Sequence, residues 1–353
     1  MSTSLGRMPT LFGDEAQAPE PALSSRRIYD PVGMWYAARL RHGIDDRMWY
    51  GFYDSSVLAP RWHTCSHRYG DGLGALPLLL AERGFPSSPP PQGRCAPRPD
   101  WRTLWRSRGQ DNLPRIDLRW HHCDASLESC PPHDPVAVLL SPEQTSAIDA
   151  AAAAAGVSST FWLQWTADRA LRASLVAPGS VSAWIFPVNL RGAVRSTDEY
   201  ANHCSGVTLR LEEGTTPLAV REQVIARMGR HEHWRQWLLL NLGRVVGQVG
   251  VNLLYRLSRA APGAFAGSYS NIGECNVPGL AGLGASGPGS PGYPVAVGTA
   301  LCNGRRSLSC RLHPVIGGNA QRAIEFVKLW RQLSMQGAPV ADVAEASAQS
   351  QPA

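Results

Sequence analysis

The stretch Ser66-His67-Arg68-Tyr69-Gly70-Asp71-Gly72 constrains the fold most, because it lies where a strand changes into a helix. Residues 60–66 alternate and contain β-favouring side chains, which predicts a strand. Residues 73–83 have the apolar spacing of a buried helix. His67 is therefore expected at a turn whose backbone holds the imidazole out into a cleft.

The residue types at this turn suit proton transfer. An imidazole can take a proton from an alcohol or an amine at neutral pH and return it. Asp71 can fix the turn through an ion pair, and Gly72 permits a backbone conformation or a close approach that a side chain would block. The same spacing also fits a simpler interpretation, in which His67 is a half-buried turn histidine and Asp71 caps the following helix.

The pattern His67-x-x-x-Asp71-Gly72 resembles the active-site motif of the chloramphenicol-acetyltransferase-like superfamily. That group includes condensation domains of peptide synthetases, plant-type alcohol acyltransferases, wax-ester-synthase-like enzymes and polyketide-associated acyltransferases. Its usual motif is His-His-x-x-x-Asp-Gly, in which the second histidine is the base. The resemblance makes His67 the base and Asp71 and Gly72 structural, with Ser66 in the place of the first histidine.

Further stretches resemble the wax-ester-synthase-like and polyketide-associated branches in the expected order. They are a helix that starts at Ser141-Pro142, a strand that ends in Pro187-Val-Asn-Leu-Arg191, residues 201–206 in the place of a Gly-Asn loop, a strand with Ser270-Asn271, a hairpin with Asn303-Gly304 and a final helix over 319–333. The resemblance covers roughly residues 58–333.

The fold class implied by this resemblance is α/β. Two chloramphenicol-acetyltransferase-like sheet-and-helix halves are expected to form a pseudo-dimer with a central tunnel, the N-terminal half being shortened. The expected division is a disordered lead-in over 1–24, an N-terminal half over 25–134, a C-terminal half over 135–337 and a disordered tail over 338–353.

The activity implied is acyl transfer from a CoA or carrier-protein thioester to a hydroxyl or an amine, with His67 as general base. Ser270 and Asn271 lie on a strand that lines the tunnel in the family, so they are candidates for stabilising the oxyanion. Ordinary strand-end hydrogen bonding is their simpler role. Arg191 is expected to form a buried pair with Asp71. The alternative is a solvated Arg191 and an Asp71 that only caps the helix.

Other functions remain open at this point. The same fold supports condensation, cyclisation or transesterification on a carrier-bound chain. The replacement of the first histidine by Ser66 and the short N-terminal half also fit a catalytically inactive binding paralogue. Catalysis by Cys65 is a third and more remote alternative.

Charge does not indicate a nucleic-acid partner. The 34 basic and 28 acidic residues give a formal charge of 34 − 28 = +6, and Lys328 is the single lysine. Such a high arginine content is typical of GC-rich coding, and no basic run is interleaved with aromatic residues. A modest attraction for an anionic substrate such as a CoA thioester remains. The expected partners are therefore a small acyl donor, an alcohol or amine acceptor and, as an option, a carrier protein.

Neither a metal nor another cofactor is expected. Residues 121–133 contain three histidines and two cysteines, but the cysteines are too far apart for a structural zinc loop, so a polar surface loop is favoured. His231-Glu232-His233 is expected on a solvated helix face. Arg244 and Arg256 interrupt the apolar stretch 237–257, which argues against a membrane span. The scattered cysteines and the absence of a signal-peptide pattern favour a cytoplasmic protein.

Overall fold

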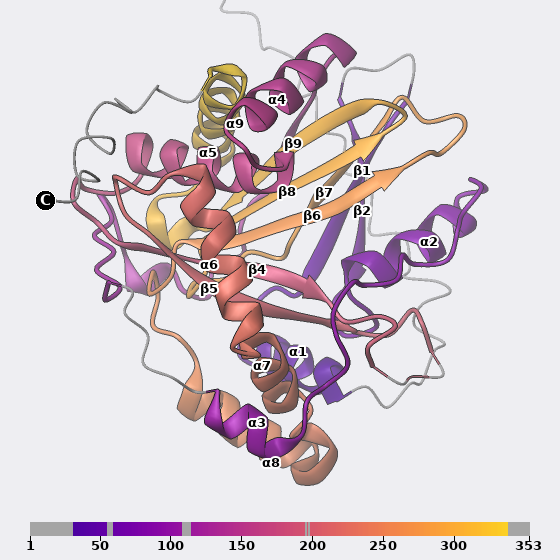
Figure 1. The fold of residues 1–353 in the computed structure, drawn as a ribbon. Coiled ribbons are helices and arrows are strands. Elements are labelled where there is room, and N and C mark those ends of the chain that lie inside the picture. Colours follow the sequence, from indigo (N-terminus) through magenta and orange to yellow (C-terminus); the bar gives the residue numbers. More distant parts are fainter. Residues whose placement is uncertain (1–30, 55–58, 108–113, 195, 197, 338–353) are drawn as a thin grey trace, which may run out of the picture.

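Two β-sheets organise the computed structural model, which describes residues 31–54, 59–107, 114–194, 196 and 198–337 (Figure 1). The expected lead-in over 1–24 and tail over 338–353 lie outside the described residues. The smaller sheet has the order β2 (Arg61–Ser66), β1 (Arg47–Tyr53) and β7 (Gly282–Ser286). The larger sheet has the order β3 (Val136–Leu139), β9 (Arg305–Leu312), β8 (Val295–Cys302), β6 (Gly267–Cys275), β4 (Ser182–Asn189) and β5 (Cys204–Leu211).

The α-helices of the described residues complete a mixed α/β architecture. They are α1 (Pro31–Arg41), α2 (Gly72–Glu82), α3 (Trp101–Arg106), α4 (Pro142–Ala154), α5 (Ser159–Ser174), α6 (Pro217–Gly229), α7 (Glu232–Leu240), α8 (Gly243–Ser258) and α9 (Ala320–Met335). Figure 1 shows α4, α5 and α9 together over the larger sheet, whereas α2 lies beside the smaller sheet. The predicted α/β class is therefore confirmed.

The main core lies between the larger sheet and its helices. Its largest fully buried side chains include Trp162 of α5, Trp184 of β4, Trp234 of α7 and Trp330 of α9. Burying such side chains is the main favourable contribution to folding, at about 25 cal/mol for each Å² of apolar surface removed from water. β4 is joined to α5 by a buried hydrogen bond, which Trp184 Nε1 donates to Asp168 Oδ1 at 2.8 Å.

A second core joins α2 to the smaller sheet. Leu76, Leu79 and Leu80 of α2 pack against β1 side chains such as Tyr50 and Phe52. The dense aromatic content of β1 is therefore core packing, as predicted, since Trp49, Tyr50, Phe52 and Tyr53 are all buried. Burial of one face of α2 explains why the chain turns sharply after β2 and returns across the sheet.

The smaller sheet takes one of its strands from a distant part of the sequence. β7 pairs antiparallel with β1, in register from Trp49 opposite Ser286 to Tyr53 opposite Gly282. In the larger sheet, β6 pairs in parallel with both β4 and β8, whereas the remaining neighbours are antiparallel. The smaller sheet therefore contains strands from both sides of the expected division at residues 134/135, because β1 lies before it and β7 after it.

Helix and hairpin boundaries follow the local sequence signals. Ser141 and Gln144 form a reciprocal capping box at the start of α4, and Ser158 is the N-cap residue of α5. Gly156 ends the first of these helices with φ +70°. Asn303 and Gly304 have φ +49° and +74°, which is the conformation of a tight hairpin turn between β8 and β9.

Asp100 caps the short helix α3 by accepting hydrogen bonds from two backbone amides. One expectation about local structure is wrong. His233 does not lie on a solvated face. It is buried next to Trp234 on the inner side of α7, and burial lowers its pKa to about 4.

Among the described residues, no single helix has the length and apolar character needed to cross a membrane. The two helices α7 and α8 together meet that test by length and composition, but they are bent by 77° with respect to each other.

Candidate active site

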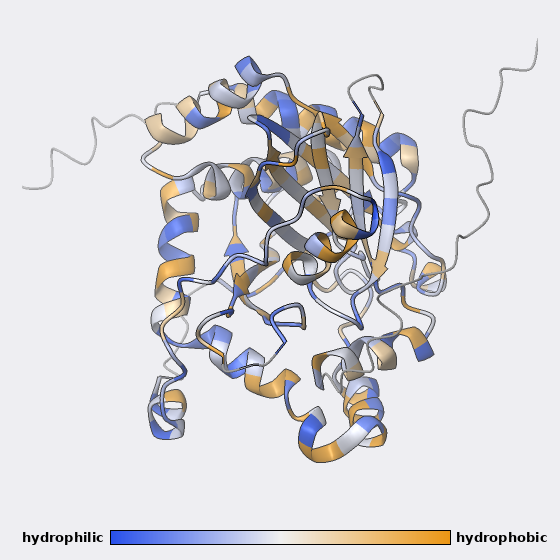
Figure 2. Cartoon of the chain, turned by 90° about the vertical axis from the view of Figure 1, so that its right-hand side faces the viewer, coloured by the Kyte–Doolittle hydropathy of each residue, from blue (hydrophilic) through white to orange (hydrophobic). Residues whose placement is uncertain are grey.

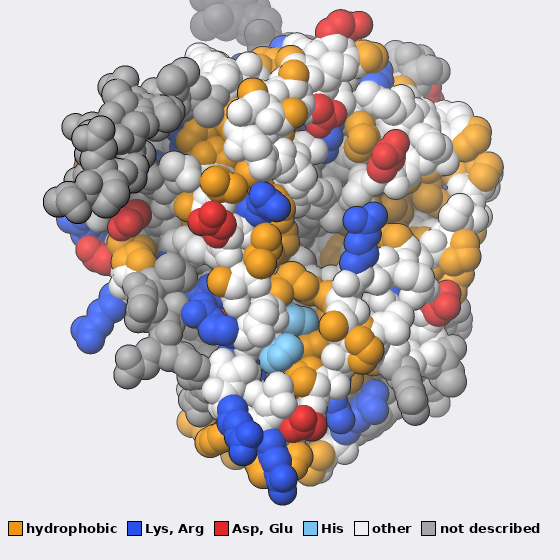
Figure 3. Space-filling view, in the orientation of Figure 1, with side chains coloured by type: hydrophobic (Ala, Val, Ile, Leu, Met, Phe, Trp, Pro, Cys, Tyr) orange, Lys and Arg blue, Asp and Glu red, His pale blue; other side chains and the backbone are white. Residues whose placement is uncertain are grey.

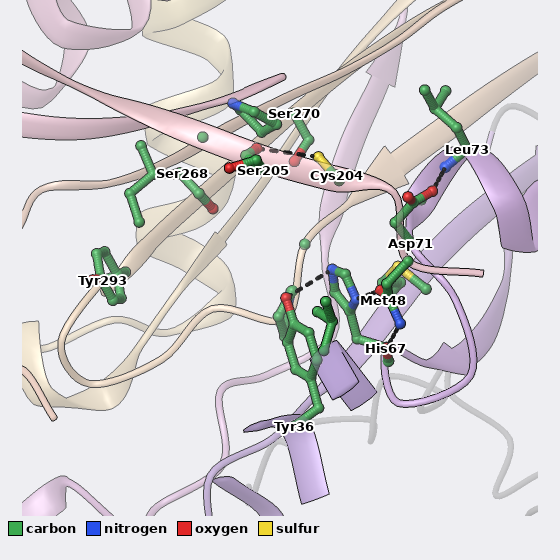
Figure 4. Close-up of a pocket in the computed structure, with 18 of the residues that line it drawn as sticks. Tyr36, Met48, His67, Asp71, Leu73, Cys204, Ser205, Ser268, Ser270 and Tyr293 are labelled. Carbon is green, nitrogen blue, oxygen red and sulfur yellow. Dashed lines mark hydrogen bonds between the residues drawn. The ribbon is translucent and has the colours of Figure 1, made fainter. Parts of the chain in front are cut away.

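A cavity of about 500 Å³ brings together residues from both sheets (Figure 4). From the N-terminal part of the chain its wall includes Tyr36 of α1, β1 side chains and His67 at the turn after β2. From the C-terminal part it includes residues of β4, β5 and β6 and the segment 285–290. A cavity of this size can hold a small organic substrate.

Asn202 fixes the ring of His67. The His67 Nδ1 atom lies 3.0 Å from Asn202 Oδ1, and Asn202 Nδ2 donates to the backbone oxygen of His67 at 3.1 Å. Because the amide nitrogen is engaged with that carbonyl, Oδ1 is the atom that faces the ring, and it can only accept. Nδ1 therefore carries the proton, and the Nε2 lone pair of the neutral ring is left for chemistry.

Burial keeps His67 in the neutral form. It lowers the pKa of His67 below the ordinary value of 6.5, and the nearby Asp71 charge opposes this only in part. A histidine with a lowered pKa is unprotonated at neutral pH, which is the state that a general base requires.

Tyr36 stacks on the imidazole. The two ring centroids are 4.0 Å apart with an interplanar angle of 9°, and the Tyr36 hydroxyl lies 3.1 Å from His67 Nε2 (Figure 4). Because Nδ1 carries the ring proton, Nε2 accepts this hydrogen bond from the Tyr36 hydroxyl. Tyr36 thus restrains the orientation of the ring on one side, while Asn202 restrains it at Nδ1.

The predicted contact between Asp71 and Arg191 is present. Arg191 Nη2 donates to Asp71 Oδ1 at 2.7 Å, and both side chains are only 2% exposed. The same carboxylate also caps α2 by accepting from the amides of Leu73 and Gly74, and its Oδ2 accepts from the amide of His203. Asp71 thus forms the predicted pair and also caps the helix, whereas the alternative of a solvated Arg191 is wrong. Although Asp71 is part of the cavity wall, its carboxylate is engaged by these four donors.

The ion pair also holds the loop that carries Asn202. Arg191 donates to the carbonyl oxygens of Glu199 and Ala201, and Asp71 accepts from the amide of His203. The backbone on both sides of Asn202 is therefore attached to one buried pair. Asp71 and Arg191 act on His67 through the position of this loop and do not contact the Nε2 atom.

The close approach expected at Gly72 occurs two residues later. A Cβ atom at Gly74 would lie 2.2 Å from the carbonyl oxygen of Tyr200, so no side chain fits there. At Gly72 the nearest atom would be the flexible Cδ1 of Ile272, 3.3 Å away. Gly74, together with Gly70, whose Cβ would lie 2.6 Å from the same oxygen, therefore lets the loop between β4 and β5 reach the start of α2.

Ser66 makes specific contacts at the position of the first motif histidine. Its hydroxyl donates to Asp46 Oδ2 at 2.6 Å and accepts from the amide of Arg68. Asp46 also accepts from the amide of His67 through its backbone oxygen. Asp46 is buried, and burial raises its pKa. Ser66 and Asp46 together fix the turn before His67.

The two oxyanion candidates differ in their surroundings. Ser270 lies in the cavity wall on β6, on the same side as Ser268 (Figure 4). Asn271 also borders the cavity, but its amide nitrogen donates to Thr160 and its oxygen accepts from Gly273. Asn271 thus makes ordinary structural hydrogen bonds, which was the simpler role given for it. Stabilisation of the oxyanion by Ser270 or Asn271 stays a prediction.

Cysteine chemistry is not favoured at this site. Cys65 is 2% exposed and packs in the core beneath the smaller sheet. Cys204 borders the cavity, but burial raises the pKa of its thiol to about 12, so it is not a thiolate at neutral pH. Among the described residues, no group of three or more histidine, cysteine or acidic side chains could hold a metal ion.

Sequence reasoning missed Tyr36 and the contact that Asn202 makes. Tyr36 lies 31 residues before His67 and Asn202 lies 135 residues after it, so no local spacing connects them. The resemblance of residues 201–206 to a Gly-Asn loop was the one sequence feature that pointed to Asn202. No sequence feature pointed to Tyr36.

No protein-family profile and no curated protein sequence matches this chain. Solved structures with a similar fold include trichothecene 15-O-acetyltransferase from Fusarium sporotrichioides, at 13% identity and a TM-score of 0.46 over 78% of this chain and 66% of that one. Polyketide synthase associated protein 5 from Mycobacterium tuberculosis is similar at 13% identity and a TM-score of 0.44, over 78% and 73% of the two chains. For the wax ester synthase/diacylglycerol acyltransferase from Marinobacter aquaeolei VT8 the identity is 14% and the TM-score 0.43, over 77% and 66%.

This chain spans 66% to 73% of the length of the three proteins.

Proposed function

We propose that this protein is an acyltransferase that moves an acyl group from a thioester to a hydroxyl or an amine, with His67 as general base. The observation that carries the proposal is the His67 ring, which is neutral, held through Nδ1 by Asn202 and placed in the wall of a 500 Å³ cavity. A base needs an accepting lone pair beside a space for the substrate; Nε2 borders the cavity, and the acceptor would take the place of the Tyr36 hydroxyl that lies 3.1 Å from it.

In the proposed reaction Nε2 takes the proton from the acceptor hydroxyl or amine as the oxygen or nitrogen attacks the thioester carbonyl. The C–S bond then breaks, and the thiolate leaves with the proton from His67. The carbonyl oxygen gains negative charge before that bond breaks, so hydrogen-bond donors must face it. The Ser270 hydroxyl in the cavity wall is the proposed donor, and Asn271 is the second candidate.

The proposal extends to the arrangement of the two halves. The cavity has walls from both the N-terminal and the C-terminal part of the chain, which supports a passage between halves that form a pseudo-dimer. The thioester, from CoA or a carrier protein, would then enter from one face and the acceptor from the other. No metal or redox group takes part in the proposed reaction.

Product analysis tests the function directly. The purified protein is offered a panel of acyl-CoA thioesters with mixed alcohols and amines, and mass spectrometry detects new esters or amides. Parallel reactions with carrier-protein thioesters distinguish the two donor forms and detect condensation or cyclisation on a carrier-bound chain. If no product forms with either donor, the inactive binding paralogue is favoured, whereas product formation by His67→Ala at the wild-type rate would refute His67 as the base.

Asn202 should be needed for the orientation of the base. We expect Asn202→Ala to lower kcat by about 10- to 100-fold, because the ring loses the acceptor that fixes its tautomer and position. Asn202→Asp keeps an acceptor oxygen and adds a negative charge beside the ring. It should therefore retain more activity than the alanine variant and raise the pKa of His67. Steady-state kinetics of the two variants would contradict this role if both matched the wild type.

The pH dependence should report the lowered pKa of His67. The base must be neutral to act, so kcat/KM should stay level as the pH falls through 6.5 and decline only below that value. Below the lowered pKa the decline should reach about tenfold per pH unit. A pH profile of kcat/KM measures this, and an acid limb centred above 6.5 would contradict a buried neutral base.

A further inference from the structure

Helices α7 and α8 expose a set of aliphatic side chains on both sides of the 77° bend between them and of the non-helical Gly247 inside α8. We call it the α8 face, and it consists of Leu239 (49% exposed), Leu242 (38%), Val245 (84%), Val246 (39%), Val249 (82%), Leu253 (56%) and Leu257 (77%). The opposite side of α8 packs on α1, where Val251 contacts Met34 and Ala38. After Gly247, Val249, Leu253 and Leu257 follow one another at four-residue spacing and therefore share one helix face, while the opposite face packs on α1.

The charge around this face is positive. From residue 233 to residue 273 the sequence has no aspartate or glutamate, but it has four arginines. Arg244 and Arg256 are exposed on α8 itself, whereas Arg259 pairs with Glu128. Figure 3 shows hydrophobic and basic side chains, with an acidic side chain between them, at the bottom of the view, where Figure 1 places α8. The helices at this end alternate between hydrophobic and hydrophilic residues along the chain (Figure 2).

Two exposed tryptophans lie at the same end of the molecule. Trp101 and Trp105 of α3 are 71% and 69% exposed. The C-terminal end of α3 is attached to α7, because Arg235 Nη1 donates to the Ser107 hydroxyl at 3.1 Å. Figure 1 shows α3, α7 and α8 together at the bottom of the molecule. Tryptophan prefers the boundary between an apolar phase and water.

We propose that this end of the molecule docks on an anionic lipid bilayer, with the α8 face inserted among the acyl chains and Arg244 and Arg256 at the phosphate level. Side chains that are 84% and 82% exposed protrude as a ridge and do not line a groove. A fluid bilayer accommodates such a ridge, whereas a folded protein partner would need a matching groove. A basic amphipathic helix without acidic residues has the composition of an interfacial helix.

The position of the cavity fits this docking. Gln236 and Leu240 of α7 border the cavity, and α7 leads directly into the α8 face. Docking would thus bring the cavity close to molecules dissolved in the bilayer.

Vesicle sedimentation with the full chain tests the proposal. We expect binding to vesicles of equal parts phosphatidylcholine and phosphatidylglycerol, and weaker binding to phosphatidylcholine alone or at high salt. The triple variant Val245→Ser/Val249→Ser/Leu257→Ser should lower the partition coefficient by about tenfold or more. Arg244→Gln/Arg256→Gln should lower binding to the anionic vesicles by about tenfold and leave binding to phosphatidylcholine unchanged.

The matched control is Leu218→Ser/Ile225→Ser, which removes two exposed apolar side chains from α6, 42% and 55% exposed, and should not change vesicle binding. Thermal unfolding of each variant shows that the fold is retained. The proposal is overturned if the wild type does not sediment with anionic vesicles, or if the triple variant binds them as the wild type does. It is also overturned if the wild type is a dimer that ignores vesicles and that the triple variant dissociates, because the α8 face would then join two copies of the chain.

Discussion

Replacing His67 by alanine should lower kcat/KM for acyl transfer by about 10²- to 10⁴-fold, because the acceptor then loses its general base. The fold should persist, since the backbone amide of His67 keeps its bond to Asp46 and the ion pair of Asp71 does not involve the imidazole. His67→Gln should be equally impaired, because an amide cannot take up the proton. Steady-state kinetics with the thioester and acceptor found by product analysis measure the effect.

His63 supplies a matched control for this prediction. It lies on β2, the strand that leads to His67, but it packs against Phe52 and does not border the cavity. His63→Gln should therefore stay within about twofold of the wild-type kcat/KM, as is usual for side chains away from the reaction. A folded His67→Ala protein with near-normal turnover would refute the base, whereas equal losses in both histidine variants would point to a general loss of structure.

The Ser66→Ala variant tests whether Ser66 stabilises the turn before His67 or takes part in the reaction. The sequence suggested that Ser66 merely fills the place of a dispensable histidine, but its hydroxyl is bonded to the buried Asp46. Removing that hydroxyl leaves a buried carboxylate without one of its donors, so stability should fall while the base remains. The activity of Ser66→Ala should accordingly far exceed that of His67→Ala.

The elements around the turn could be predicted because their signals are local. The strand before His67, the helix after Gly72, the capping box at Ser141 and the Asn303-Gly304 hairpin each depend on a few neighbouring residues. The contact between Asp71 and Arg191 could be predicted only through the family resemblance, since 120 residues separate the two side chains.

The rest of the site depends on tertiary packing that sequence patterns do not show. Tyr36 reaches His67 because α1 packs on α8, and β7 joins β1 from the far end of the chain. The true position of His233 was missed because the charged neighbours in its sequence suggested a solvated helix, whereas the Trp234 beside it turns that face inward. Non-local contacts of this kind decide which of several plausible side chains meet in one cavity.

Breaking the pair between Asp71 and Arg191 should be the most destabilising single change near the site. Both side chains are 2% exposed, so removing one partner leaves the other charge buried without its counter-ion. Asp71→Asn or Arg191→Leu should lower the free energy of unfolding by about 3–5 kcal/mol. Urea unfolding of each variant measures the loss. The exposed pair of Asp117 and Arg119 is the matched control, and Asp117→Asn should cost less than about 1 kcal/mol.

The double variant Asp71→Asn/Arg191→Leu distinguishes a stranded charge from lost packing. If the cost of each single variant comes from the unpaired partner, the double variant should be less destabilised than the sum of the two single losses. Activity should fall in all three proteins, because the loop that carries Asn202 is bonded to both members of the pair. Strictly additive losses would mean that the two side chains stabilise the protein independently. Unchanged activity in stable variants would mean that this loop does not depend on the pair for its position.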